Sequence, residues 1–220
     1  MQPDFESMTL EEMAQALAPA IADAAVFDGW SDAAVASAAG MHGLDPDVAR
    51  LAFPGGAMDM ISAWISSVDR AMADALPPEA LAQMGFTARI KSMLVFRLEQ
   101  AAMKREALRR AMAVMALPKN VTGTARLSWR TADLMWRLAG DTASDFNHYT
   151  KRAILASIYA ATLAVLVDDD SPEQAETYAF LDRRLADIGK FGKAKARFMG
   201  EGREHFSVAR FLGRLRYPAR

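Results

Sequence analysis

The sequence predicts an all-α fold, and three observations support this. Alanine, leucine and methionine are abundant, with 14 methionines among 220 residues, and these residue types favour helices. Apolar residues recur at helical spacing along much of the chain, and no run alternates β-branched residues as a strand would require. A chain of this length can bury one sizeable helical core, so a second domain is possible but not required.

The amino-terminal region predicts one long helix followed by two short ones. Thr9 can cap a helix over about 10–27, which ends at an Asp-Gly pair. A short helix over about 31–39 is followed by a glycine turn and a third helix over about 46–52. This order is the outline of a helix-turn-helix module, which we assign to residues 1–57.

The rest of the chain predicts five longer helices, each bounded by a cap residue, a glycine or a proline. They cover about 58–76, 86–115, 124–140, 145–168 and 172–188. The second of them is expected to break between residues 100 and 108. We expect these helices to form a ligand-binding and dimerisation bundle over 58–188, followed by a basic tail over 189–220 within one structural unit overall.

The net charge of −1 hides a strong segregation of charge along the chain. Residues 1–60 carry ten acidic side chains against a single basic one, Arg50, whereas residues 189–220 carry nine basic and two acidic side chains. A DNA-reading helix needs basic or amide side chains for the bases and cations for the phosphates. The predicted third helix instead places Asp45 and Asp47 beside Arg50. We therefore expect a degenerate module that binds no nucleic acid and serves as scaffold.

The residues for most catalytic and metal chemistry are missing. Cysteine is absent, which excludes disulfides, thiol nucleophiles and zinc sites built on thiolates. Asp145 and His148 have the spacing of di-iron bundles, but neither His42 nor His205 supplies a second motif. The acidic run 168–170 is better explained as a helix end than as a cation site. With no phosphate loop or nucleophile elbow either, we expect no enzyme, no metal and no cofactor apart from a bound lipid.

The sequence also bears on location. Residues 1–12 contain acidic side chains and no basic one, which is unlike a signal or transit peptide. The longest apolar run, 153–167, is interrupted by polar side chains and is shorter than the roughly 20 residues that span a bilayer. We expect a cytoplasmic bacterial protein.

One stretch contains a specific series of motifs in unbroken register: Met135-Trp136, Ala139-Gly140-Asp141, Ser144-Asp145-Phe146-Asn147 and Tyr149-Thr150-Lys151-Arg152. This series resembles the signature of a known family, the coenzyme Q (ubiquinone) biosynthesis accessory lipid-binding proteins. The resemblance is strong over about 113–186 and looser before it, where Asp28-Gly29-Trp30 agrees with the family. A pattern of this length is too specific to arise from composition.

The resemblance implies a homodimer with the architecture of TetR-type regulators, whose helical bundle encloses an apolar pocket. Such proteins hold isoprenoid quinone precursors at the membrane and present them to a pathway hydroxylase, the demethoxyubiquinone hydroxylase. Carried over by motif, the docking residues are Met135, Asp145, His148 and Tyr149; family members carry tryptophan where this chain has His148. A ligand-responsive TetR-type transcription regulator is the alternative function.

Large apolar and aromatic residues of the bundle are candidates for the pocket wall. Methionine suits such a wall because its flexible thioether adapts to a lipid chain. Residues of this kind also fill ordinary cores, so core packing is the alternative for each of them. The predicted lipid-binding residues are Met93, Phe96, Trp136, Leu155, Ile158 and Tyr159.

The tail predicts an amphipathic basic helix over about 203–216. Such a helix can lie in a membrane interface with its apolar face among the acyl chains and its arginines near anionic lipid. A terminal helix docked on the protein is the alternative, but a membrane-seeking terminal helix is also implied by the family resemblance. The predicted membrane-binding residues are Arg203, Phe206, Arg210, Phe211, Leu212, Arg214 and Leu215. We therefore expect peripheral association with the inner membrane.

Overall fold

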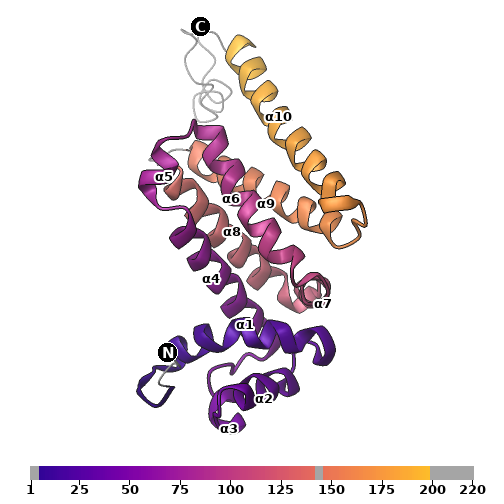
Figure 1. The fold of residues 1–220 in the computed structure, drawn as a ribbon. Coiled ribbons are helices and arrows are strands. Elements are labelled where there is room, and N and C mark those ends of the chain that lie inside the picture. Colours follow the sequence, from indigo (N-terminus) through magenta and orange to yellow (C-terminus); the bar gives the residue numbers. More distant parts are fainter. Residues whose placement is uncertain (1–4, 142–145, 199–220) are drawn as a thin grey trace, which may run out of the picture. The chain divides into compact units, whose positions relative to one another are not determined.

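A computed structural model describes residues 5–141 and 146–198, and within these ranges the chain is helical and forms no strand (Figure 1). This confirms the all-α prediction. The helices are α1 (Leu10–Asp28), α2 (Asp32–Met41), α3 (Pro46–Arg50), α4 (Ala57–Ala75), α5 (Pro78–Ala82), α6 (Phe86–Ala102), α7 (Arg105–Met115), α8 (Val121–Leu138), α9 (Phe146–Leu166) and α10 (Ala175–Phe198). Short 3-10 helices cover Phe5–Ser7, Pro118–Asn120 and Pro172–Gln174.

The chain divides into two compact units, residues 1–181 and 182–220. The first contains α1 to α9 and the start of α10, and the second contains the rest of α10. In the second unit, Arg184 forms an ion pair with Asp187 one turn later, at 3.7 Å. The boundaries predicted after residues 57 and 188 stay predictions, and the site described below lies within the first unit.

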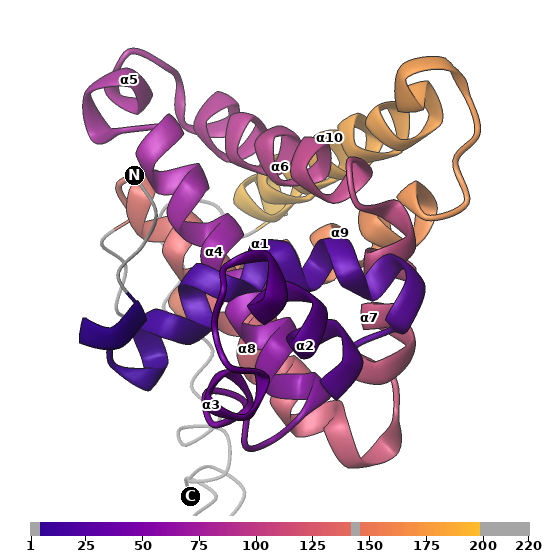
Figure 2. The same ribbon diagram turned by 60° about the horizontal axis from the view of Figure 1, so that its bottom comes forward.

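The amino-terminal module has the helix-turn-helix outline that the sequence predicts. Thr9 and Glu12 form a capping box: the Thr9 hydroxyl accepts from the Glu12 amide at 3.3 Å, and the Glu12 carboxylate accepts from the Thr9 amide at 2.8 Å. The helix that follows, α1, packs against α2, α4 and α7. Figure 2 shows α2 and α3 beside α1 at this end of the unit.

The turn after α1 attaches the module to the bundle. Gly29 has φ 66° and ψ −176°, a conformation that only glycine adopts readily. This turn directs the buried Trp30 into the bundle, where its indole N–H donates to the carbonyl of Ala107 on α7 at 3.0 Å. Its ring lies 5.3 Å from that of Trp64 on α4, measured between centroids. A single side chain therefore joins the module to two helices of the bundle.

The bundle is built around α4, which packs against α6, α7 and α8, while α9 packs against α6 and α8. The predicted break in the helix over 86–115 is confirmed, since α6 ends at Ala102 and α7 begins at Arg105. The five-residue α5, which follows Pro77, was not predicted. None of the described helices combines the length and apolarity needed to cross a membrane.

The acidic run 168–170 ends α9 and leads into α10, as predicted. Asp168 and Asp170 form ion pairs with Arg109 and Arg105 of α7, at 2.9 and 3.0 Å. Asp169 is buried, and its carboxylate accepts from the amide of Thr177 at 2.8 Å. Burial by itself would raise the pKa of Asp169, but hydrogen bonds from Ser171 and Thr177 outweigh it and hold the pKa well below its usual range.

Candidate functional site: an apolar cavity in the helical bundle

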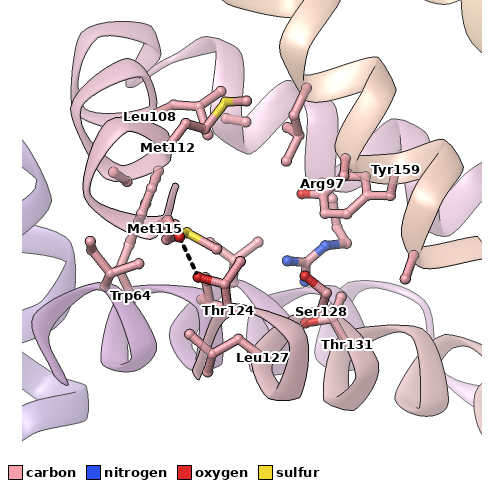
Figure 3. Close-up of a pocket in the computed structure, with 18 of the residues that line it drawn as sticks. Trp64, Arg97, Leu108, Met112, Met115, Thr124, Leu127, Ser128, Thr131 and Tyr159 are labelled. Carbon is pink, nitrogen blue, oxygen red and sulfur yellow. Dashed lines mark hydrogen bonds between the residues drawn. The ribbon is translucent and has the colours of Figure 1, made fainter. Parts of the chain in front are cut away.

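The bundle encloses a partly open cavity of about 240 Å³. Its wall is formed by side chains of α4, α6, α7, α8 and α9 and is predominantly apolar. Figure 3 shows this space between the helices, with Trp64, Leu108, Met112 and Met115 on one side. It exceeds the roughly 150 Å³ of an engineered apolar cavity that binds benzene.

Four helices supply the wall with the same pattern of positions. Each contributes residues at i, i+3, i+4 and i+7, which form one stripe along a helix. Because every stripe faces the same centre, the wall is continuous. The stripes are Ile61, Trp64, Ile65 and Val68 on α4; Leu108, Ala111, Met112 and Met115 on α7; Thr124, Leu127, Ser128 and Thr131 on α8; and Ala156, Tyr159, Ala160 and Leu163 on α9.

Small residues explain why the centre stays open. On α9, the stripe alternates alanine with larger residues, so Ala156 and Ala160 leave unfilled the volume beside Tyr159. Ala111 on α7 and Ser128 on α8 have the same effect. Protein interiors are normally close-packed, so a space of this size at the centre of a bundle suggests a ligand.

A buried ion pair forms a polar corner of the cavity. Arg97 of α6 lies on the wall with its side chain 3% exposed and pairs with Asp69 of α4. The Thr131 hydroxyl on α8 donates to the same carboxylate, at 3.2 Å to Oδ2. The guanidinium carbon lies 5.0 Å from the ring centroid of Tyr159 on α9. Four helices therefore meet at this corner.

The charges of this corner are compensated locally. Burial raises the pKa of Asp69, and this rise is opposed by the Arg97 charge and by the Thr131 hydrogen bond. The Arg97 guanidinium stays protonated throughout the physiological range, because burial lowers its pKa less than Tyr159 and Asp69 raise it. The paired charges make the corner polar without giving it a net charge.

The predicted lipid-binding residues divide between the cavity wall and the surrounding core. Tyr159 lines the cavity, whereas the other five predicted residues do not. Met93 is fully buried between helices, and Leu155 and Ile158 are also buried. Trp136 lies against the ring of Phe86 at 5.3 Å, away from the cavity wall. Phe96 is half-buried on α6. For these five, lipid contact stays a prediction.

Most of the wall was not predicted, although the sequence contains a signal for it. The prediction favoured large side chains on α6, α8 and α9, but small side chains are what leave a cavity open. Three stretches, on α7, α8 and α9, have small or hydroxyl residues at i, i+3, i+4 or i+7 and would have indicated their stripes. The pairing of Asp69 with Arg97 joins different helices and has no local sequence signal.

The signature residues of the α8–α9 connection form a buried cluster of charges. Arg152 of α9 donates from Nε to Asp133 of α8 at 2.5 Å and from Nη1 to Asp141 at 3.3 Å. Lys151 donates to Asp141 at 2.7 Å and lies 5.3 Å from the ring centroid of Trp136. Burial would raise the pKa of Asp141, but hydrogen bonds and charges from Lys151 and Arg152 lower it. The motif thus fixes the junction of two helices that line the cavity.

The predicted docking residues lie in different environments. His148 and Tyr149 are adjacent on α9, with ring centroids 5.1 Å apart, and Tyr149 is 61% exposed. Trp129 of α8, which was not predicted, lies 5.8 Å from the ring of Tyr149. Met135 is fully buried within the chain, and its contact with a partner stays a prediction. Asp145 lies outside the described residues.

The predicted membrane-binding residues, Arg203, Phe206, Arg210, Phe211, Leu212, Arg214 and Leu215, also lie outside the described residues. Among those that are described, no group of three or more His, Asp or Glu side chains is placed to hold a metal ion.

The fold and the cavity together define a class, the all-helical proteins with TetR-like architecture. A crystal structure of a TetR transcriptional regulator from Nitrosomonas europaea superposes with a TM-score of 0.64 and 19% sequence identity. The match covers 81% of this chain and 98% of that one. At this level of identity the comparison establishes the fold only.

Sequence comparisons then give the family. Residues 121–192 match the COQ9 family model. The mitochondrial ubiquinone biosynthesis protein COQ9 of Rattus norvegicus is 31% identical over 171 residues, covering 74% of this chain and 54% of that protein. The Homo sapiens protein of the same name is 29% identical over 198 residues, covering 87% of this chain and 61% of that protein. The chain therefore contains a COQ9 family-model domain and is homologous to these ubiquinone biosynthesis proteins, and it spans a little more than half the length of these relatives.

Proposed function

We propose that this chain is a non-enzymatic, lipid-binding accessory protein of ubiquinone biosynthesis. Its relatives are named for that pathway, which supports a role in it. The apolar cavity among α4 and α6–α9 carries the proposal of lipid binding. The described residues that line the cavity combine neither a nucleophile with a base nor a set of metal ligands. We therefore propose binding without catalysis.

The cavity takes part of an isoprenoid quinone precursor, and the remaining chain extends through the open side. Burial of each methylene contributes about 0.8 kcal/mol. A few isoprene units against Trp64, Met112 and Met115 therefore give useful affinity. The ligand enters from the membrane and is presented to a pathway hydroxylase.

The exposed aromatic surface of α8 and α9 is our candidate for docking that hydroxylase, the demethoxyubiquinone hydroxylase. Trp129, His148 and Tyr149 form one cluster, and aromatic residues are enriched at protein interfaces. Family members carry tryptophan at the position of His148. In this chain, the ring of Trp129 lies beside that position, 6.3 Å from the ring of His148 between centroids. The functional unit is proposed to be a homodimer.

The basic tail provides membrane association in this proposal and places the protein at the cytoplasmic surface of the bacterial inner membrane. Nine basic side chains over residues 189–220 favour an anionic surface. Flotation with anionic liposomes tests this: removal of residues 200–220 should abolish it. Flotation that is unchanged by the deletion would exclude the tail as the anchor.

Native mass spectrometry with lipid extraction, on protein purified from a ubiquinone-producing bacterium, tests the central proposal. We expect a co-purifying isoprenoid quinone or precursor. Ala156→Phe fills the cavity from α9 and should remove that lipid, whereas Ala153→Phe, at an exposed position on the same helix, should retain it. A wild-type protein that is empty and indifferent to added lipid would contradict the proposal.

A transcription regulator is the second candidate, because the fold is that of a TetR regulator. The charge of the amino-terminal module argues against it. Asp45 and Asp47 lie at the start of α3, where a DNA reader needs cations. We expect no shift of DNA from the protein's own promoter at roughly physiological salt, and a specific shift would restore the regulator as the better candidate.

A further inference from the structure

The proposed lipid site contains a feature that an apolar chain does not use. Arg97 reaches the cavity wall although its side chain is only 3% exposed. Its Nε–H is buried and has no hydrogen-bond partner among the described residues. A buried donor without an acceptor costs free energy comparable to a lost hydrogen bond. An oxygen atom of a ligand would satisfy this donor.

A second hydroxyl lies at the same corner. Ser128 of α8 lines the cavity one helical turn from Thr131, whose own hydroxyl is occupied by Asp69. Figure 3 shows the Arg97 guanidinium, Ser128 and the Tyr159 ring on one side of the space. The corner therefore offers hydrogen-bond donors and an aromatic surface to a flat polar group.

The charge of the corner limits which group can bind. Asp69 already neutralises Arg97, and Arg130, the other cation that acts on Asp69, is exposed, so the buried corner has no net charge to balance an anion. Bringing a phosphate or carboxylate into this buried space would leave an unpaired charge in an apolar environment, which is costly. An uncharged oxygen needs no counter-ion and can still accept a hydrogen bond from Arg97.

The opposite side of the cavity has the reverse character. Trp64, Leu108, Met112 and Met115 present apolar surface there, and the Thr124 hydroxyl is turned to the Met115 carbonyl at 2.8 Å. This hydrogen bond removes a polar group from the wall. A chain fits on this side while a head group lies beside Arg97, which gives the bound lipid one orientation.

We propose that Arg97, held by Asp69, is the specificity-determining residue of the cavity: it selects lipids with an uncharged, oxygen-bearing head group and discriminates against anionic ones. This inference rests on the proposed function, since it concerns the same lipid site. It specifies the orientation of the ligand, that is, which helices lie beside the head group and which beside the chain. It also specifies the chemical class of head group that the cavity accepts.

Three ligands with the same fifteen-carbon chain test the proposal on the wild-type protein: farnesol, farnesyl diphosphate and the hydrocarbon farnesene. Binding is followed by tryptophan fluorescence, because Trp64 forms part of the wall. We expect farnesol to bind about tenfold more tightly than farnesyl diphosphate, the ratio that one net hydrogen bond or a modest charge penalty produces. Equal or tighter binding of the diphosphate would overturn the proposal.

The double variant Arg97→Met/Asp69→Asn tests the residue itself. Removing both charges avoids leaving Asp69 buried without its partner. The variant should bind farnesene as the wild type does but lose most of the wild-type preference for farnesol over farnesene. Arg126→Met, an exposed change on α8, should leave that preference unaltered.

The outcomes separate the two proposals. A variant that keeps the farnesol preference would overturn the role of Arg97 while leaving lipid binding intact. Failure of the wild type to bind any of the three ligands would overturn lipid binding and this inference with it. If the double variant does not fold, the wild-type series still decides whether uncharged head groups are selected.

Discussion

Arg152 on α9 donates from its Nε to the carboxylate of Asp133 on α8, at 2.5 Å. The arginine is only 2% exposed, and its second carboxylate partner, Asp141, is 7% exposed. This junction therefore contains several desolvated charges, which stabilise the fold only when all of them are present. It lies between α8 and α9, which carry two of the four cavity stripes and the aromatic surface.

Arg152→Ala should destabilise the protein by about 3–5 kcal/mol, because it leaves buried carboxylates without their cation. Chemical denaturation followed by circular dichroism measures this. Arg137→Ala is the matched control: Arg137 also pairs with Asp133, at 2.7 Å, but is 72% exposed. Its loss should cost less than about 0.5 kcal/mol. Equal effects of the two substitutions would show that the buried cluster has no special role.

A pH-dependent contribution to stability is expected from Asp169. Its pKa is lowered in the folded protein by hydrogen bonds from Ser171 and Thr177, in spite of burial. The carboxylate therefore stabilises the fold fully above its unfolded-state pKa of about 4, and this stabilisation is lost as the pH falls toward the lower folded-state pKa. Asp169→Asn should cost about 2–3 kcal/mol at pH 7.

The difference in unfolding free energy between Asp169→Asn and the wild type should stay constant from pH 7 to about 5 and narrow below about 4. Asp170→Asn is the control, because Asp170 is 94% exposed and its ion pair with the half-buried Arg105 lies at the surface end of that side chain. Its effect should be small at every pH. A penalty for Asp169→Asn that does not change below pH 4 would show that the ionised carboxylate is not the stabilising form.

Local signals made much of the fold predictable. Thr9 caps α1 as expected, and the Asp-Gly pair before Trp30 ends it, because capping and turn formation depend on neighbours in sequence. The cavity was less accessible. The prediction selected large residues such as Trp136, whereas Ala156 and Ala160 are the residues that leave the space. Whether the space beside a stripe of alanines is filled depends on the side chains of the facing helices.

Long-range contacts were hidden for the same reason. Trp30 agreed with the family pattern, but its hydrogen bond to Ala107 spans 77 positions. Asp69 and Arg97 are separated by 28 positions and lie on different helices. No periodicity connects such residues, since their proximity follows from the packing of α4, α6 and α7.

Trp30→Phe tests the attachment of the amino-terminal module. The phenylalanine keeps the aromatic contact with Trp64 but removes the indole N–H, so the Ala107 carbonyl loses its buried donor. We expect a loss of about 1–3 kcal/mol in thermal or chemical denaturation. Trp129→Phe, in the half-exposed aromatic cluster, should cost clearly less. The reverse order of the two effects would contradict a structural role for the Trp30 hydrogen bond.

Gly29→Ala and Gly40→Ala should change stability in opposite directions. Gly29 has φ 66° and ψ −176°, so an alanine there is strained by about 1–3 kcal/mol, although its added methyl group would meet no atom closer than 3.6 Å.

Gly40 lies within α2 with open space around the added carbon. Alanine there should stabilise the protein by roughly 0.5–1 kcal/mol, because it favours the helix and reduces the freedom of the unfolded chain. Melting temperatures of the two variants measure the contrast. Since space is available at both positions, a stable Gly29→Ala protein would mean that the turn before Trp30 can adopt another backbone conformation without releasing the module from α7.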